Sequence, residues 1–340
     1  MKTFKHILTL VLALTLYACD DTSFSDPHLM PVKVSGVRIH NVSNVKPLPD
    51  GTVAYPVSES GGVKIAKISR DGTVTYSELV DDLDANNLFV NASGECLVSS
   101  GTKVAKYDRL GNVVLVDKID DYYPTMLLDN GDICYSVFKT YEGCIDIYTI
   151  GNNFKCVIYS EVDWMDVFPF DDKWFAYNSS NLFCIYDADG NVVCDGELDG
   201  SVDAMKYING YLYIIVKNDD KCSVVKMSTD GRIIYSAEVE NTDIYNLTVH
   251  DGKLLVAGEV TDIAKDGTYG LIYVLDDING GVISSIPTKF KGCEIIPLYI
   301  SPDANGEYDV YATRRDNYES DYPQLVIYHT DDLGKLNIIN

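Results

Sequence analysis

Five aspartates recur along the chain at a nearly constant interval. Asp84, Asp121, Asp163, Asp203 and Asp243 are separated by 37, 42, 40 and 40 residues, and each stands four residues before a position in a predicted strand. Carboxylates gathered at one place raise one another's pKa unless a cation or backbone donors compensate. One hypothesis is a site for a metal ion, with Ca²⁺ as the candidate, or for a cationic ligand. The other, which we favour, is that each aspartate caps its own turn.

A second group of residues is suited to contact a ligand through aromatic rings. Tyrosine and tryptophan beside aspartate and asparagine are typical of carbohydrate-binding surfaces, because sugars stack their C–H faces on the rings. Trp164 and Tyr245 are equally suited to plug a central channel. Arg314 and Arg315 are the only adjacent arginines in the chain. The ligand-contact residues that we predict are Tyr122, Tyr123, Trp164, Tyr245, Tyr269, Arg314, Tyr318 and Tyr322.

The signatures of common catalytic centres are absent from the sequence. Gly-x-Ser-x-Gly, His-Glu-x-x-His, P-loop and Cys-x-x-Cys motifs do not occur. The chain has only five histidines, and this scarcity argues against histidine-based acid–base or metal catalysis. We therefore predict no catalytic residue, although the many aspartates leave carboxylate-pair chemistry of the glycosidase type open.

The elements that must position these residues repeat with a period near 40 residues. Tight turns fall into an inner and an outer series, and runs of β-forming residues flank each turn. The inner turns are at Gly51, Gly94, Gly131, Asp172, Gly210, Gly252 and Gly306, and the outer turns are at Gly72, Gly111, Gly151, Gly190, Gly231, Gly281 and Gly334. Two hairpins in each repeat give four strands, which we label A to D in chain order.

This repeat predicts an all-β fold, a seven-bladed β-propeller of four-stranded antiparallel blades, with six or eight blades as alternatives. The run 211–216 is apolar on both faces, as a strand stacked between two other blades requires. We expect Val32–Ile39 to pair with the last blade near Leu336–Ile339 and so close the ring. The expected propeller domain is 32–340, with blades at about 38–80, 81–120, 121–162, 163–200, 201–240, 241–290 and 291–340.

The last two repeats are longer than the others. The extra residues fall between strands B and C, at about 258–269 and 314–323. In propellers the B–C connections share one face with the connections from strand D to the next strand A, and that face is the usual ligand surface. One hypothesis is a ligand site over the sixth and seventh blades. The other, which we favour, is a surface insertion of no function, because loops accept extra length at little cost.

The N-terminus resembles the leader of a bacterial lipoprotein. Lys2 and Lys5 precede an apolar stretch, Ile7–Leu16, that is too short to span a membrane as a helix. The motif that follows, Leu16-Tyr17-Ala18-Cys19, is similar to a lipobox. In that motif the cysteine becomes the acylated N-terminus of the mature protein.

This resemblance implies a signal peptide at 1–18, acylation of Cys19 and a flexible tether over 19–31. Asp20-Asp21 resembles the acidic tether of Bacteroidetes-type lipoproteins. The implied location is the outer membrane, with the protein anchored by lipid and exposed at the cell surface.

The outer hairpins resemble those of quinoprotein-like propellers, with the pattern Leu-Asp-x-x-x-Gly-x-x. The repeat region as a whole is similar to WD40-like and TolB-like propellers. Quinoprotein-like blades carry a docking tryptophan after the turn, whereas Val116, Tyr159, Asp195 and Ser236 stand at the comparable places. We therefore predict no quinone cofactor, and the resemblance implies architecture without function.

Charge and cysteine content limit the partners. Without residues 1–18 the chain keeps 25 basic against 51 acidic residues, a formal charge of −26, which excludes nucleic acid as a partner. Eight cysteines follow Cys19. Cys184 with Cys194, and Cys144 with Cys156, are candidates for disulfides across a hairpin, but we favour buried free thiols.

Taken together, these features predict a surface-anchored binding or scaffold module. Its expected partner is a glycan, a peptide or another outer-membrane protein. The alternative is a carbohydrate-active enzyme, a glycosidase or lyase, that uses carboxylates on the face of the D–A connections.

Overall fold

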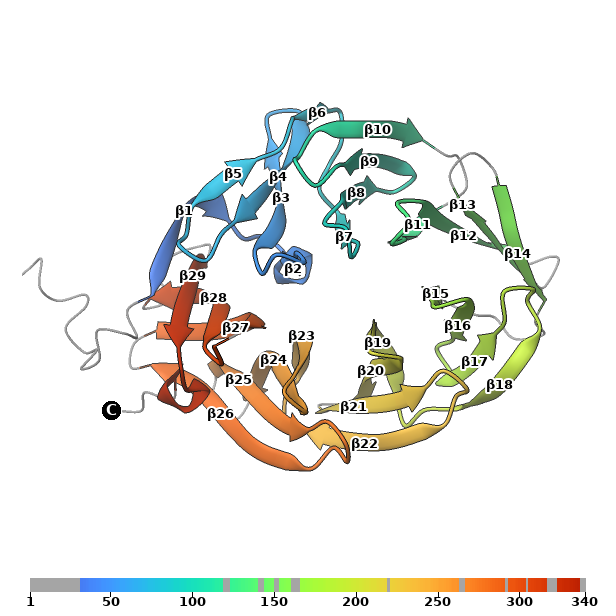
Figure 1. The fold of residues 1–340 in the computed structure, drawn as a ribbon. Helices are drawn as coiled ribbons and strands as arrows, with labels where there is room; N and C mark the ends of the chain where they lie inside the picture. Colours follow the sequence, from blue (N-terminus) through green and yellow to red (C-terminus); the bar gives the residue numbers. More distant parts are fainter. Residues whose placement is uncertain are drawn as a thin grey trace, which may run out of the picture.

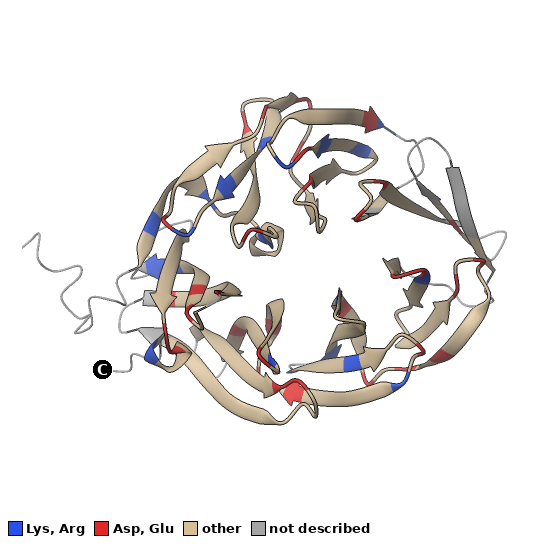
Figure 2. Ribbon diagram, in the orientation of Figure 1, with Lys and Arg blue, Asp and Glu red and all other residues tan. Residues whose placement is uncertain are grey.

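The computed structural model describes residues 31–118, 123–139, 144–149, 153–159, 166–218, 221–262, 267–290, 293–303, 305–316 and 323–336. Its strands form seven antiparallel blades around a central axis, which confirms the predicted seven-bladed β-propeller (Figure 1). Strand A of each blade lies nearest the axis and strand D lies at the rim (Figure 1). Acidic residues occur all around the ring (Figure 2).

The first three blades follow one another along the chain. Blade 1 consists of β2 (Lys46–Pro47), β3 (Val53–Glu59), β4 (Gly62–Ile68) and β5 (Val74–Tyr76), with β6 (Val80–Asp81) also paired to β4. Blade 2 consists of β7 (Asn87–Val90), β8 (Cys96–Ser100), β9 (Lys103–Tyr107) and β10 (Val113–Lys118). Blade 3 consists of β11 (Tyr123–Leu127), β12 (Ile133–Lys139), β13 (Cys144–Thr149) and β14 (Asn153–Tyr159).

From blade 4 to blade 6 the strands become longer. Blade 4 consists of β15 (Asp166–Phe170), β16 (Lys173–Tyr177), β17 (Leu182–Tyr186) and β18 (Val192–Glu197). Blade 5 consists of β19 (Ser201–Ile208), β20 (Tyr211–Asn218), β21 (Lys221–Ser228) and β22 (Ile233–Val239). Blade 6 consists of β23 (Asp243–His250), β24 (Lys253–Asp262), β25 (Gly267–Asp276) and β26 (Val282–Phe290).

Blade 7 takes strands from both ends of the chain. It consists of β27 (Cys293–Pro302), β28 (Tyr308–Asp316), β29 (Gln324–Thr330) and, as its outermost strand, β1 (Val32–Arg38). The closure by the N-terminal strand was therefore predicted correctly, but its partner was not. β1 pairs with β29, as in Val32↔Ile327, whereas Leu336 lies in a 3-10 helix and residues 337–339 lie outside the described part.

The reason lies in the last turn of the chain. Leu333–Leu336 is a 3-10 helix, and its two leucines are buried in the core between blades 6 and 7. Gly334 therefore lies in this helix and does not form an outer hairpin turn, contrary to the prediction. Among the described residues no strand follows β29, and its edge pairs with β1.

Seven apolar clusters hold the ring together, one between each pair of adjacent blades. Blade 5 shows how a single strand serves two of them. In β20, Leu212, Ile214 and Val216 pack toward blade 4, whereas Tyr213 and Ile215 pack toward blade 6. All five side chains are at most 4% exposed. The apolar run 212–216 is thus buried on both faces of the blade, as predicted, whereas Tyr211 at the start of the strand is exposed.

The hairpin turns follow from their residue types. In the turn after β17, Asp187 Oδ1 accepts hydrogen bonds from the backbone nitrogens of Asp189 at 3.0 Å and Asn191 at 2.8 Å. Gly190 adopts a left-handed φ of 86°, which only glycine takes without strain. The hydrogen bond from the Asn191 side chain lowers the pKa of Asp187 most, and the backbone hydrogen bonds lower it further. The carboxylate of Asp187 is therefore occupied by the backbone of its own turn.

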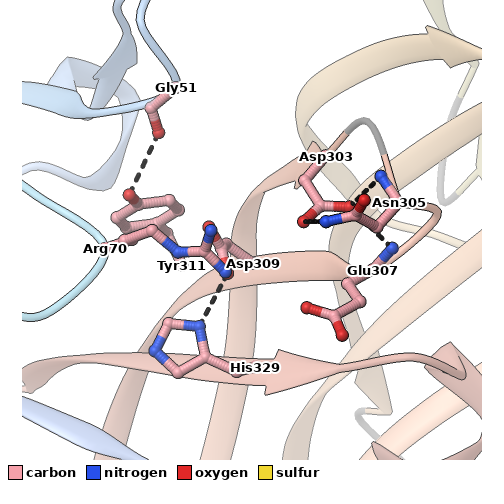
Figure 3. Close-up of polar contacts among 8 residues, drawn as sticks. All are labelled: Gly51, Arg70, Asp303, Asn305, Glu307, Asp309, Tyr311 and His329. Carbon is pink, nitrogen blue, oxygen red and sulfur yellow. Dashed lines mark hydrogen bonds and ion pairs between the residues drawn. The ribbon is translucent and has the colours of Figure 1, made fainter.

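The ring is closed by polar contacts as well as by β1. The buried carboxylate of Asp309 on β28 accepts from His329 Nδ1 at 2.6 Å and from Arg70 Nη2 at 3.2 Å (Figure 3). Tyr311 on β28 donates to the carbonyl oxygen of Gly51 at 3.1 Å (Figure 3). Since Arg70 and Gly51 belong to blade 1, both contacts tie blade 7 to its neighbour.

The described cysteines have free thiols, as favoured from the sequence. Cys184 lies opposite Asp195 and Cys194 lies opposite Ile185, so the two cysteines are not cross-strand partners. The proposed Cys144–Cys156 bridge involves side chains outside the described part, although their strands are also offset, because Cys156 lies opposite Ile147. Burial raises the pKa of the Cys184 thiol to about 11, which makes it unreactive.

Within the described residues, no helix is long and apolar enough to cross a membrane. The leader and Cys19 lie outside those residues.

Candidate functional site

The face that carries the B–C and D–A connections is built differently over blade 6 than the sequence suggested. The described part of the extra segment continues the two strands, because β24 and β25 are paired ten-residue strands as far as Asp262↔Gly267. In blade 7, β27 and β28 likewise pair from Cys293↔Asp316 onward. Polar residues near these strand ends are therefore held on a rigid framework.

Six side chains on this face of blades 5 to 7 form what we call the polar cluster. Each of them is linked to another member by a hydrogen bond, an ion pair or an electrostatic effect on its pKa. The members are Lys217 of β20, Asp243 and Tyr245 of β23, Glu259 of β24, Glu294 of β27 and Arg315 of β28.

The bulge in β23 places Tyr245 in the cluster. The register of β23 against β24 shifts between Ile244↔Gly258 and Asn246↔Ala257, which leaves Tyr245 without a cross-strand partner. Its ring is half-buried against the apolar core between blades 7 and 1. Gly258 allows the close approach of the two strands, because a Cβ atom there would lie 2.1 Å from the carbonyl oxygen of Asp243.

Tyr245 and Glu259 form the centre of the cluster. The Tyr245 hydroxyl and the Glu259 carboxylate lie close enough to shift one another's pKa. Burial raises the pKa of Glu259, the Tyr245 hydroxyl lowers it, and the charges of Asp243 and Glu294 raise it further. Burial and the same three carboxylates also raise the pKa of Tyr245. The tyrosine therefore stays neutral and can act as a donor.

Two cations flank these groups. Lys217 Nζ lies 2.5 Å from Asp243 Oδ1, and this hydrogen bond is the main reason why the pKa of Lys217 is raised. Arg315 Nη1 lies 3.7 Å from Glu294 Oε2. Burial raises the pKa of Glu294, whereas Arg315 lowers it. The cluster thus combines two carboxyl groups of raised pKa, Glu259 and Glu294, with two cationic hydrogen-bond donors.

The described members of the predicted aspartate series, Asp84, Asp203 and Asp243, do not together form a site. Asp84 and Asp203 are exposed, and Asp243 is paired with Lys217. Asp121 and Asp163 lie outside the described residues. Among the residues that the structure describes, no group of three or more His, Cys, Asp or Glu side chains is arranged to hold a metal ion. The Ca²⁺ site remains a prediction.

Three of the predicted ligand-contact residues are described with their side chains. Tyr245 belongs to the polar cluster, and Tyr269 is half-buried on β25 opposite Val260. Arg314 is 7% exposed and lies opposite Ile295, beside the more accessible Arg315. The remaining predicted residues, Tyr122, Trp164, Tyr318, Tyr322 and the side chain of Tyr123, lie outside the described part.

Lys217, Glu259, Glu294 and Arg315 were not among the predicted site residues. Glu259 and Glu294 each stand in a largely apolar strand, in the runs Leu254–Val260 and Cys293–Leu298. A charged residue inside a strand that is otherwise buried is the signal that would have identified them. That signal does not say which blades the charges belong to, and their convergence comes only from the ring.

A groove lies on the same face, between β1 and blade 1. It has a volume of about 1030 Å³, and its wall includes Val34, Arg38, His40, Tyr55 and Gln324. The Tyr55 hydroxyl accepts a hydrogen bond from the backbone nitrogen of His40 at 2.7 Å, which fixes the loop at the edge of the groove. The strand that closes the ring therefore also shapes this surface.

Comparison with known proteins supports the fold. No protein-family model matches the chain, and no curated protein sequence matches it. A chain of the mitotic checkpoint complex is similar in structure, with a TM-score of 0.57 and 12% identity over 90% of this chain and 96% of that one. BamB from Moraxella catarrhalis has a TM-score of 0.50 and 14% identity over 88% and 97% of the two chains.

A protein of unknown function from Bacteroides caccae is 14% identical, covers 68% of this chain and 92% of its own, and has a TM-score of 0.45. Identities this low show a shared architecture and not a shared function. The β-propeller fold is compatible with a binding or scaffold module.

Proposed function

We propose that this protein is a binding or scaffold module whose ligand surface is the face of the B–C and D–A connections over blades 5 to 7. The observation that carries the proposal is the polar cluster. A half-buried tyrosine, three carboxylates and two cations converge there from three blades. Donors and acceptors held on rigid strands are suited to recognise a polar ligand with defined geometry.

The ligand that we propose is a glycan, a peptide or a partner outer-membrane protein. Tyr245 and Glu259 offer hydrogen-bond partners for sugar hydroxyls or backbone amides, and Lys217 and Arg315 offer positive charge. The strongly negative chain, at a formal −24, disfavours polyanionic ligands.

A thermal-shift screen tests this function without assuming the chemistry. The protein is screened against oligosaccharides, polysaccharides, peptides and metal ions, because binding to the folded state raises its melting temperature by mass action. We expect a shift with one ligand class, and we expect Arg315→Met to reduce it. Arg232→Met is the matched control, because Arg232 is an exposed residue of an outer turn on the opposite face. An equal reduction by both variants would contradict the proposed surface.

We also propose that Cys19 carries the lipid anchor implied by the N-terminal motif, which would place the protein at the outer membrane with the propeller exposed. Mass spectrometry of the protein from membranes should find Cys19 as an acylated N-terminus. Cys19→Ser should release the protein from the membrane fraction. A protein that keeps residues 1–18 in its membrane-bound form would contradict the anchor.

The second candidate function is a carbohydrate-active enzyme. It is favoured by the raised pKa values of Glu259 and Glu294 on one face, since a glycosidase needs one carboxyl group that keeps its proton near neutral pH. Glu259→Gln and Glu294→Gln should then each abolish turnover of a saccharide. Glu307→Gln, an exposed position on the opposite face, should leave turnover unchanged. Binding without turnover would leave the first candidate alone.

A further inference from the structure

The opposite mouth of the central channel, where the A–B turns lie, holds a second cavity. Its volume is about 990 Å³, which is within the range of small-molecule sites. The wall is formed by the A strands and A–B turns of blades 1 to 5 and is mostly apolar. It includes Leu48, Met126, Phe168, Phe170 and Tyr207.

Lys206 of β19 is one of the residues that line this cavity. Its Nζ donates to Asn246 Oδ1 at 2.8 Å and to the carbonyl oxygen of Leu247 at 3.1 Å, both on β23. These acceptors are neutral, and an ammonium group has three donors. No ion pair links Lys206 to a carboxylate among the described residues.

A second lysine increases the positive potential at the same mouth. Lys46 lies on β2, next to Pro47 of the cavity wall. Burial lowers the pKa of both lysines, that of Lys206 to about 8, and the charge of Lys46 adds to the effect at Lys206. In a chain with a formal charge of −24, two ammonium groups with little compensation stand beside an apolar cavity. An anion is the ligand that would remove this cost.

We propose that this cavity binds a small organic monocarboxylate with an apolar body, and that the Lys206 ammonium pairs with its carboxylate group. The apolar wall covers the body of the ligand, and the third N–H of Lys206 donates to the carboxylate. Asp129 and Asp171 also line the cavity and disfavour a second negative charge. Because this site lies on the opposite face from the polar cluster, it does not depend on the proposed function.

Calorimetric titration of the purified protein with 4-phenylbutyrate and with its uncharged amide tests the proposal. The two probes have nearly the same shape, so their difference isolates the carboxylate. We expect the carboxylate to bind at least about tenfold more tightly than the amide, as one charge-assisted hydrogen bond implies. Equal affinities, or no saturable binding of either probe, would overturn the proposal.

Lys206→Met should weaken binding of 4-phenylbutyrate by about tenfold or more. Lys217→Met is the control, because Lys217 belongs to the polar cluster on the other face and its removal should leave this binding unchanged. Unchanged affinity in folded Lys206→Met would overturn the proposal.

The pH profile of the unmodified protein gives a measurement that does not require a folded variant. The affinity should fall about tenfold per pH unit above pH 8, where Lys206 loses its proton. The other groups that face it are Lys46, Asp129, Asp171 and Tyr207. Burial also lowers the pKa of Lys46, so its titration acts in the same direction as that of Lys206. Burial raises the pKa of Tyr207 above its ordinary value. An affinity independent of pH up to about pH 10 would overturn the proposal.

Discussion

Removal of one hydroxyl group, in Tyr245→Phe, probes the centre of the polar cluster. Burial raises the pKa of the Glu259 carboxyl group, whereas the nearby Tyr245 hydroxyl lowers it. The hydroxyl therefore favours the ionised carboxylate, so its loss should raise the pKa of Glu259 further. A hydrogen bond to a charged group contributes about 1.5–3 kcal/mol, and the half-buried position of Glu259 reduces the contribution expected of the Tyr245 hydroxyl to about 1–2 kcal/mol.

The sign of the effect on stability follows from the ionisation of Glu259. An acid whose pKa is raised in the folded protein favours folding at low pH and loses that contribution as the pH rises through its folded pKa. Tyr245→Phe should therefore cost about 1–2 kcal/mol near pH 8, where Glu259 is ionised, and about 0.5–1 kcal/mol near pH 5, where the proton is increasingly retained. Urea unfolding at several pH values measures this difference.

Tyr135→Phe is a matched control for this experiment. Tyr135 is 1% exposed, and its hydroxyl makes no hydrogen bond with the described residues. The control should change the free energy of unfolding by a similar, small amount at every pH. If Tyr245→Phe lost the same free energy of unfolding at pH 5 and pH 8, the Tyr245 hydroxyl would not influence the ionisation of Glu259.

Three further changes test other parts of the structure. Gly258→Ala should lower the free energy of unfolding by about 1–3 kcal/mol and displace the β23 bulge, because the new Cβ would lie 2.1 Å from a backbone oxygen. Gly210→Ala should lower it by about 1 kcal/mol, because the new Cβ has open space around it but the φ of 81° is strained for alanine. Urea unfolding measures both changes. Deletion of residues up to 39 removes β1 and exposes the edge of β29, so size-exclusion chromatography should show self-association of the shortened chain and a monodisperse peak for the longer one. Lys206→Met should raise the free energy of unfolding by about 1–2 kcal/mol below pH 8, because the lowered pKa of Lys206 means that its charge opposes folding there. This gain should vanish above about pH 10.5, where the lysine is neutral in the folded and the unfolded chain. Urea unfolding at each pH measures the difference.

The architecture could be predicted because local sequence signals determine each of its elements. Each hairpin has its own turn residues, as Asp187 and Gly190 show, and the apolar residues on both faces of a strand such as β20 are evident from its own sequence. The repeat period of these signals predicts the number of blades. The closure by β1 could also be anticipated, because an unpaired edge in a ring needs a strand from elsewhere.

The exact partner of β1 and the polar cluster could not be predicted in the same way. Gly334 has the spacing of a hairpin turn, but the burial of Leu333 and Leu336 between two blades decides the conformation there. Glu259 and Glu294 lie 35 positions apart and on different blades, so their proximity depends on the curvature of the ring. Regular spacing identified Asp243 as a site residue but gave no indication of its partner, Lys217.

Hydrogen–deuterium exchange with and without the ligand found in the screen tests the proposed binding surface most directly. If the polar cluster is the ligand surface, protection should appear in the peptides that contain β23, the outer part of β24 and the start of β27. The A–B turns on the opposite face, such as 128–132 and 303–307, should exchange as before. Protection confined to those turns, with no change at Asp243 to Glu259, would contradict the proposed surface.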